Sequence, residues 1–136
     1  KKQIPYFKSR TLILNKKIDS QEIFKSGNYY LFNIWSSWCI PCRDEHSILM
    51  ELSQNNSLEI IGLNYKDKTS NAKKFLEELG NPFSQVIIDR NGLIAIEWGA
   101  YGVPESFLIN DQKKIIKKFL GPLNSKTLKE IKVYLK

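Results

Sequence analysis

The strongest constraint on the fold is a seven-residue run, 29–35, that is apolar on both alternating faces and is interrupted only by Asn33. A strand of this kind belongs in the middle of a sheet that is covered on both sides. The only two cysteines of the chain, Cys39 and Cys42, follow directly, and an apolar repeat at helical spacing comes after them. Cys-x-x-Cys between a strand and a helix is typical of thiol–disulfide exchange, which is the chemistry we expect here.

The rest of the chain predicts one mixed α/β domain over residues 1–136, with residues 1–28 as an N-terminal extension. Strands that alternate with helices imply parallel pairing, and a late hairpin adds an antiparallel edge. Further strands are expected at 11–14, 58–63, 85–88, 105–109 and 114–120. Helices are expected at 19–24, after Cys42, at 70–79 with Ser70 as a cap, and at the C-terminus with Asn124 or Ser125 as a cap. Residues 93–98 are ambiguous between a loop and a short helix.

Charge and length exclude several classes of protein. The formal net charge is +7, but the lysines are scattered, which predicts a solvated basic surface and no nucleic-acid partner. No run approaches the roughly 18 apolar residues of a membrane span. The chain begins without methionine, so a removed signal peptide or anchor is compatible with the sequence.

The two cysteines are expected to have different roles. Cys39 at the entry of a helix faces unpaired N–H groups and the positive end of the helix dipole, which favour a thiolate. Pro41 falls in the first turn, where its missing N–H costs little. Cys42 lies one turn deeper, so Cys39 would attack a substrate disulfide and Cys42 would resolve the mixed disulfide. A disulfide closing so short a loop adds little stability, as suits a bond that opens and closes.

Glu45 shares a helix face with Cys42, Leu49 and Leu52, and that face must pack on the sheet. A carboxylate behind the second cysteine is a candidate proton carrier during exchange. The alternative is a first-turn Glu that only favours the helix dipole and sits in water.

Two other interpretations of the cysteines stay open. They would be half of a zinc site if two further ligands were present, but only His46 remains as a Cys or His ligand. They would otherwise be inert core residues, although Ile40 and Pro41 between them suit a turn better. No metal site is therefore predicted, and Trp38 is expected at the rim of the redox site.

Four blocks in the right order resemble the thioredoxin superfamily, and within it the CcmG/DsbE group of thiol reductases of cytochrome c maturation. The blocks are Asn33-Ile34-Trp35-Ser36-Ser37-Trp38-Cys39-Ile40-Pro41-Cys42-Arg43-Asp44-Glu45-His46, Gly62-Leu63-Asn64-Tyr65-Lys66-Asp67, Leu79-Gly80-Asn81-Pro82-Phe83 and Tyr101-Gly102-Val103-Pro104-Glu105-Ser106-Phe107-Leu108-Ile109. The resemblance implies a thioredoxin-like fold, with a central mixed sheet flanked by helices, the N-terminal extension and an inserted strand–helix.

The resemblance also implies the opposite wall of the site. Val103-Pro104 would be a cis peptide facing the cysteines, and Pro104 would shape the groove for the substrate backbone together with Trp38 and Pro41. Glu105 would add acidity to that groove. Many thioredoxins carry a buried Asp where this chain has Asn33, which leaves Glu45 as the nearest candidate for proton transfer.

The function implied is reduction of protein disulfides in the periplasm. The partner would be apocytochrome c or a maturation protein that handles its thiols, with electrons from a membrane thiol transporter and no organic cofactor. The full-length protein would be tethered to the inner membrane. Two alternatives remain, a periplasmic disulfide oxidoreductase of broader specificity, reductive or oxidative, and a non-catalytic binding module.

Overall fold

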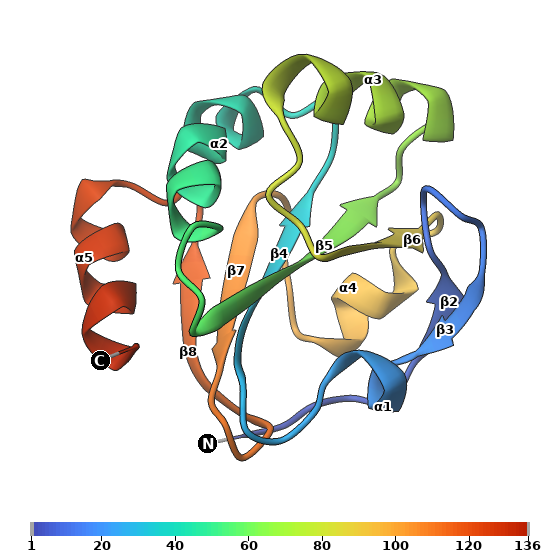
Figure 1. Cartoon of the computed structure of the whole chain (residues 1–136). Helices are drawn as coiled ribbons and strands as arrows, with labels where there is room; N and C mark the ends of the chain where they lie inside the picture. Colours follow the sequence, from blue (N-terminus) through green and yellow to red (C-terminus); the bar gives the residue numbers. More distant parts are fainter. Residues whose placement is uncertain (1, 136) are drawn as a thin grey trace.

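The computed structural model describes residues 2–135, and a six-stranded mixed sheet forms its centre (Figure 1). The strand order is β1-β8-β7-β4-β5-β6. Strand β4 pairs in parallel with β5 and antiparallel with β7, as the sequence predicted. The strands are β1 (Lys2–Gln3), β4 (Tyr29–Trp35), β5 (Leu58–Tyr65), β6 (Gln85–Asp89), β7 (Glu105–Ile109) and β8 (Lys114–Leu120).

Helices cover both faces of this sheet. They are α1 (Ser20–Ile23), α2 (Ile40–Leu52), α3 (Thr69–Leu79), α4 (Leu93–Glu97) and α5 (Ser125–Tyr134). Residues of α2, α3 and α5 share one buried cluster with Leu31 and Trp35 of β4. Residues of α1 and α4 share a second cluster with Phe32 and Ile34. Alternate side chains of β4 therefore point to opposite faces, which explains why the whole run is apolar.

The expected strand at 11–14 is wrong. Two short strands of the N-terminal extension, β2 (Lys8–Arg10) and β3 (Lys17–Asp19), form an antiparallel hairpin around that segment. Thr11 makes only an isolated bridge to Ile87, and Asn15 adopts a left-handed conformation with φ 52°. These apolar residues form a turn in which Leu12 is buried in the core whereas Ile13 and Leu14 are exposed, so their hydrophobicity did not indicate a buried strand.

Helix boundaries follow the sequence with one exception. Asp19 caps α1 and Asn124 caps α5, each in a reciprocal capping box, and residues 93–97 form a short helix. Ser70 does not cap α3, because that helix already begins at Thr69 with Lys68 as its N-cap. Within residues 2–135, no helix has the length and apolar character that a membrane crossing requires.

Candidate active site

The two cysteines lie where β4 leads into α2, and they are joined by a disulfide with a Cα–Cα distance of 5.3 Å. Cys39 is the N-cap of α2, and its Sγ accepts a hydrogen bond from the Cys42 N–H at 3.2 Å. Pro41 stands in the first turn of the helix, as predicted. The sulfur of Cys39 thus occupies the place of an oxygen in an ordinary N-cap, where unpaired N–H groups stabilise negative charge.

Exposure alone does not separate the two cysteines. Cys39 is 4% exposed and Cys42 is 1% exposed. The side chains around them are open to solvent instead, since Trp38 and Ile40 are 57% and 73% exposed and Pro41 is exposed. The distinction between an attacking and a resolving sulfur therefore rests on the capping position of Cys39.

A carboxylate from the β5–α3 connection holds the loop before the cysteines. Asp67 accepts hydrogen bonds from the backbone N–H and the hydroxyl of Ser37, at 2.7 and 2.8 Å, and from Asn64 at 3.1 Å. The indole N–H of Trp38 donates to the Lys66 carbonyl at 2.9 Å. Sequence reasoning placed these residues in a block of resemblance but gave Asp67 no role, because only the fold brings β5 beside the cysteine loop.

Glu45 is fully buried on the sheet-facing side of α2, which we call the redox helix. Its Oε2 accepts from Asn33 Nδ2 at 2.9 Å, and its Oε1 accepts from the Leu123 N–H at 3.0 Å. Among residues 2–135, no cation lies within ion-pair distance of this carboxyl. Burial raises the pKa of Glu45 to about 7, and the two hydrogen bonds only partly oppose that rise. The alternative of a solvated first-turn Glu is therefore wrong.

Asn33 joins this carboxyl to the neighbouring strand. Its Nδ2 also donates to Ser106 Oγ on β7 at 3.0 Å, while its Oδ1 is buried and has no hydrogen-bond partner in the described part of the chain. Oδ1 and Nδ2 of an Asn can exchange places by rotation of the amide. Asn33 can therefore present either a donor or an acceptor to Glu45.

The segment 99–104, which we call the proline loop, leads into β7 at the end of the sheet from which the cysteine loop departs. Val103-Pro104 is a cis peptide, as the resemblance implied. Ile34 pairs with Glu105 across β4 and β7, so Pro104 comes level with Trp35, at the end of β4 from which the cysteine loop departs. Pro104 is buried and Val103 is half-buried, whereas Tyr101 at the tip of the loop is 90% exposed.

Glu105 lies on the other face of the sheet from Glu45. Its neighbours at the same strand parity, Phe107 and Ile109, belong to the cluster with α1 and α4. Its Oε2 accepts from the Tyr101 and Gly102 N–H groups at 2.7 and 3.1 Å, and its Oε1 lies 3.3 Å from Lys118 Nζ. The structure thus brings Cys39, Cys42 and Glu45 together and sets Glu105 apart beneath the proline loop.

The side chain of His46 contacts α3 and its C-cap residue. Its Nε2 lies 2.8 Å from the Gly80 carbonyl, and its ring meets Phe75 edge to face. Burial lowers the pKa of His46, which favours the neutral ring that donates to Gly80. The only histidine therefore ties α2 to the end of α3.

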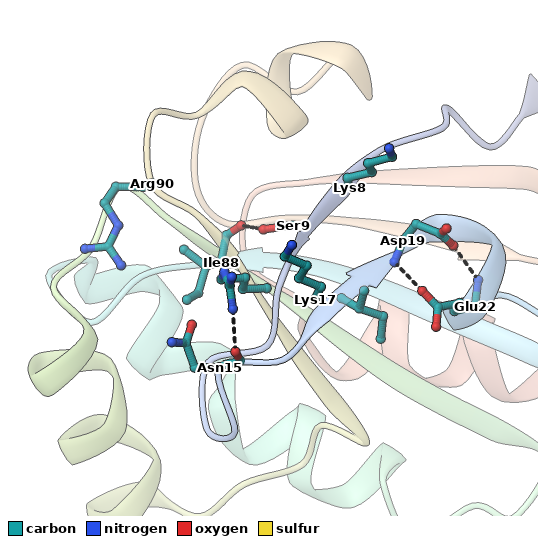
Figure 2. Close-up of a pocket in the computed structure, with 10 residues that line it drawn as sticks. Lys8, Ser9, Asn15, Lys17, Asp19, Glu22, Ile88 and Arg90 are labelled. Carbon is teal, nitrogen blue, oxygen red and sulfur yellow. Dashed lines mark hydrogen bonds between the residues drawn. The ribbon is translucent and has the colours of Figure 1, made fainter.

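A surface hollow of about 660 Å³ lies away from this site, between the β2–β3 hairpin and β6 (Figure 2). Hydrogen bonds among its lining residues join the hairpin to its neighbours, since Ser9 Oγ donates to the Ile88 carbonyl of β6 and Asp19 exchanges two hydrogen bonds with Glu22 of α1. Neither a cysteine nor a residue of the proline loop lines it. Around the cysteines, by contrast, Trp38, Ile40 and Pro41 are exposed.

Comparison with known proteins agrees with this geometry. The Redoxin family matches residues 1–135. Thiol:disulfide interchange protein CycY of Rhizobium leguminosarum bv. viciae is 49% identical over 76% of this chain and 56% of its own length. Thiol:disulfide interchange protein DsbE of Vibrio cholerae is 40% identical over 95% of this chain and 69% of its own length. This chain thus spans little more than half of CycY.

Solved structures share the fold at lower sequence identity. A DsbF homologue from Corynebacterium diphtheriae has a TM-score of 0.82 at 20% identity, covering 96% of this chain and 85% of its own. StoA from Bacillus subtilis has a TM-score of 0.71 at 24% identity, covering 93% and 96%. These likenesses establish the thioredoxin-like fold. With the redox helix, the proline loop and the relatives all in agreement, the chain belongs to the Redoxin family and, within the thioredoxin superfamily, to the CcmG/DsbE group.

Proposed function

We propose that this chain is a single thioredoxin-like domain that reduces protein disulfides. The observation that carries the proposal is the Cys39–Cys42 disulfide at the N-terminus of α2, together with the buried carboxyl of Glu45 on the same helix, whose pKa is raised to about 7. A thiolate at Cys39 is stabilised by the helix N-terminus, and a carboxyl with a pKa near 7 can take and return a proton at neutral pH.

The reaction begins with both cysteines reduced. The Cys39 thiolate attacks one sulfur of the substrate disulfide, so a mixed disulfide forms and the other substrate sulfur leaves as a thiolate. Glu45 takes the proton of Cys42, whose thiolate then attacks the sulfur of Cys39. The Cys39–Cys42 disulfide forms, and the second substrate sulfur leaves as a thiolate. The two substrate thiolates then become thiols by taking up two protons, one released by Glu45 and one from water. Two electrons pass from this chain to the substrate.

The substrate lies between the redox helix and the proline loop. Trp38 and Pro41 form one rim, and both are exposed. Val103 and Pro104 form the opposite wall, next to which the substrate backbone is expected to lie. Glu105 acts from below this wall, and its contribution to the acidity of the groove stays a prediction.

The physiological setting follows from the relatives. Their names describe thiol:disulfide interchange, and the CcmG/DsbE group implies cytochrome c maturation in the periplasm. We propose apocytochrome c, or a maturation protein that handles its thiols, as the electron acceptor. A membrane thiol transporter would be the donor, and the full-length protein would be tethered to the inner membrane.

The test uses an oxidised Cys-x-x-Cys-His peptide, the sequence at which haem c is attached. Cys42→Ser should accumulate a mixed disulfide with this peptide, because Cys39 attacks and nothing resolves. Cys39→Ser is the matched control and should accumulate none. Equal absence of an adduct from both variants would leave a non-catalytic binding module and end the proposal.

The direction of electron flow needs a second measurement. Equilibration of the wild-type Cys39/Cys42 pair with glutathione gives its reduction potential. A reductant is expected well below the value of about −120 mV that marks a strong bacterial oxidant. A potential near that value would favour the alternative of an oxidative enzyme.

A further inference from the structure

Lys118 on β8 occupies a position that the redox chemistry does not require. It pairs across the sheet with Phe107 of β7, and its side chain is 31% exposed. Its Nζ donates to the Gly99 carbonyl at 2.7 Å and lies 3.3 Å from Glu105 Oε1. The same ammonium lies 4.8 Å from the centre of the Tyr101 ring, within cation–π range.

These contacts join the two ends of the proline loop. Gly99 begins the loop, and Glu105 is the first residue after it. Glu105 in turn holds the middle of the loop, through the Tyr101 and Gly102 N–H groups. One lysine and one carboxylate therefore tie the start, the tip and the end of a segment that belongs to no helix or strand.

We propose that Lys118 is a positioning residue that sets the shape of the proline loop, and through it the affinity for the substrate. The proposal rests on the proposed function, because the loop matters to substrate only if it forms the wall of the groove. Lys118 touches no reacting atom. It acts through Glu105 and the loop backbone, and it supports the ring of Tyr101, which is open to a partner.

The physical reason is the preorganisation of an exposed loop. A substrate backbone that lies along residues 102–104 gains most when the loop already has its bound shape, because ordering it on binding costs conformational entropy. The contact of Lys118 Nζ with the Gly99 carbonyl is a charge-assisted hydrogen bond, which is stronger than a neutral one. The ion pair with Glu105 adds Coulombic attraction to Oε1, an oxygen that is buried and accepts no hydrogen bond within residues 2–135. Without the ammonium, Glu105 would lose its cation, and the Gly99 carbonyl would lose a donor.

Lys117 provides a matched control. It is the preceding residue of the same strand, and it is half-buried like Lys118. It pairs with Leu108, on the other face of the sheet, and its Nζ contacts Glu130 of α5 at 2.6 Å. Lys117→Met and Lys118→Met therefore remove the same charge from neighbouring positions, and only the second change touches the proline loop.

The first test measures amide hydrogen exchange in the free oxidised protein and does not depend on the proposed function. In Lys118→Met, exchange at Tyr101 and Gly102 should accelerate on the order of tenfold, the effect of losing a charged hydrogen bond. Lys117→Met should leave both amides unchanged, and Lys118→Arg should retain most of the protection. Unchanged exchange in Lys118→Met, or acceleration spread over the whole sheet, would overturn the proposal.

The second test measures reduction of the oxidised Cys-x-x-Cys-His peptide. In Lys118→Met, KM should rise on the order of tenfold with kcat nearly unchanged, because weaker preorganisation costs binding rather than chemistry. Lys117→Met should match wild type, and Lys118→Arg should recover most of the loss. Equal KM values in the two Met variants would refute the role of Lys118. An inactive wild type would refute the proposed function and leave the exchange result to decide the loop's shape.

Discussion

Glu45 and Glu105 are both buried near the redox site, but they lie on different faces of the sheet and have different partners. Glu45 lies on the α2 face of the sheet and is held by Asn33 and the Leu123 N–H, with no cation nearby among residues 2–135. Glu105 lies on the opposite face, 3.3 Å from Lys118 Nζ, and holds two N–H groups of the proline loop. Exposed fractions of 0% and 4% do not distinguish the two side chains.

The difference shows that the hydrogen-bond donors and cations around a buried carboxyl, rather than its burial, decide the role to which it is suited. A buried carboxyl without a cation is costly to ionise, so Glu45 is suited to exchange a proton near neutral pH. A buried carboxylate with a cation and two N–H donors is suited to hold backbone in place. In the proposed function, Glu45 transfers a proton during exchange, and Glu105 holds the shape of the proline loop.

The largest effect on stability is expected from placing a second carboxyl group beside Glu45. Asn33→Asp replaces the donor 2.9 Å from Glu45 with a second carboxylate, and two such groups cannot both ionise. We expect a loss of about 3–5 kcal/mol in the free energy of unfolding at pH 8, comparable to leaving a buried charge uncompensated. At pH 5 a shared proton should make the loss much smaller. Urea unfolding at both values measures it, and equal losses would contradict the prediction.

Glu45→Gln should change how stability depends on pH. Because the folded pKa of about 7 is above the ordinary pKa of 4.5 for a glutamate, the unfolded chain releases this proton first as pH rises. Wild type should therefore lose about 3 kcal/mol of stability between pH 4.5 and 7 through this group. Gln keeps an acceptor for the Leu123 N–H, and Asn33 can rotate its free Oδ1 toward the new amide.

The measurement is the free energy of unfolding of the oxidised protein at several pH values. The difference between Glu45→Gln and wild type should grow in favour of the variant across that window and level off above it. Glu51→Gln, at a surface residue that pairs with Lys132, controls for the loss of any carboxylate. A constant difference from pH 4 to 8 would show that Glu45 ionises no less readily when folded.

Resolution of the mixed disulfide should also separate the two carboxylates. Glu45 must lose its proton before it can accept one from Cys42, so the rate should rise with pH through about 7 in wild type. Glu45→Gln should remove that rise and slow release of the peptide about 100-fold above pH 7, the lower end of general base catalysis. Glu105→Gln should leave this step intact. Rapid-quench trapping of the adduct measures both, and equal slowing would end the division of roles.

The smallest effect is expected from neutralising Glu105. Gln keeps an acceptor for the Tyr101 and Gly102 N–H groups but removes the ion pair with Lys118, so a loss of about 1 kcal/mol is expected. Combined with Lys118→Met, the two losses should be less than additive, because both changes break one interaction. Thermal or urea unfolding of the two single variants and the double variant completes the cycle. Strict additivity would mean that the pair is not coupled.

The sequence predicted those parts of the site that are local along the chain. The strand 29–35, the cap position of Cys39 and the buried face of Cys42 and Glu45 each follow from periodicity within one segment, and the structure confirms them. The cis peptide before Pro104 came from the resemblance alone.

What it could not predict depends on pairing between distant segments. Lys118 reaches the proline loop only because β8 pairs with β7 in one register, with an irregularity between Leu108 and Ile109 that breaks simple alternation. Asp67 reaches Ser37 only because β5 lies beside β4. Lys117 and Lys118 are adjacent residues of the same type, so the sequence alone does not show which of the two faces the loop.

The contact between Asn33 and Ser106 has a consequence for how the chain finds its register. It is a polar pair in the middle of two largely apolar strands, with Asn33 opposite Ser106 and 3.0 Å between Nδ2 and Oγ. A slip of one residue in β7 would turn every side chain to the other face. Ser106 would then enter the aromatic cluster around Phe32, and Glu105 would join Glu45 on one face without its lysine. The Asn33–Ser106 hydrogen bond therefore favours the native register, because the slipped register would lose it and would place both glutamates on the same face of the sheet.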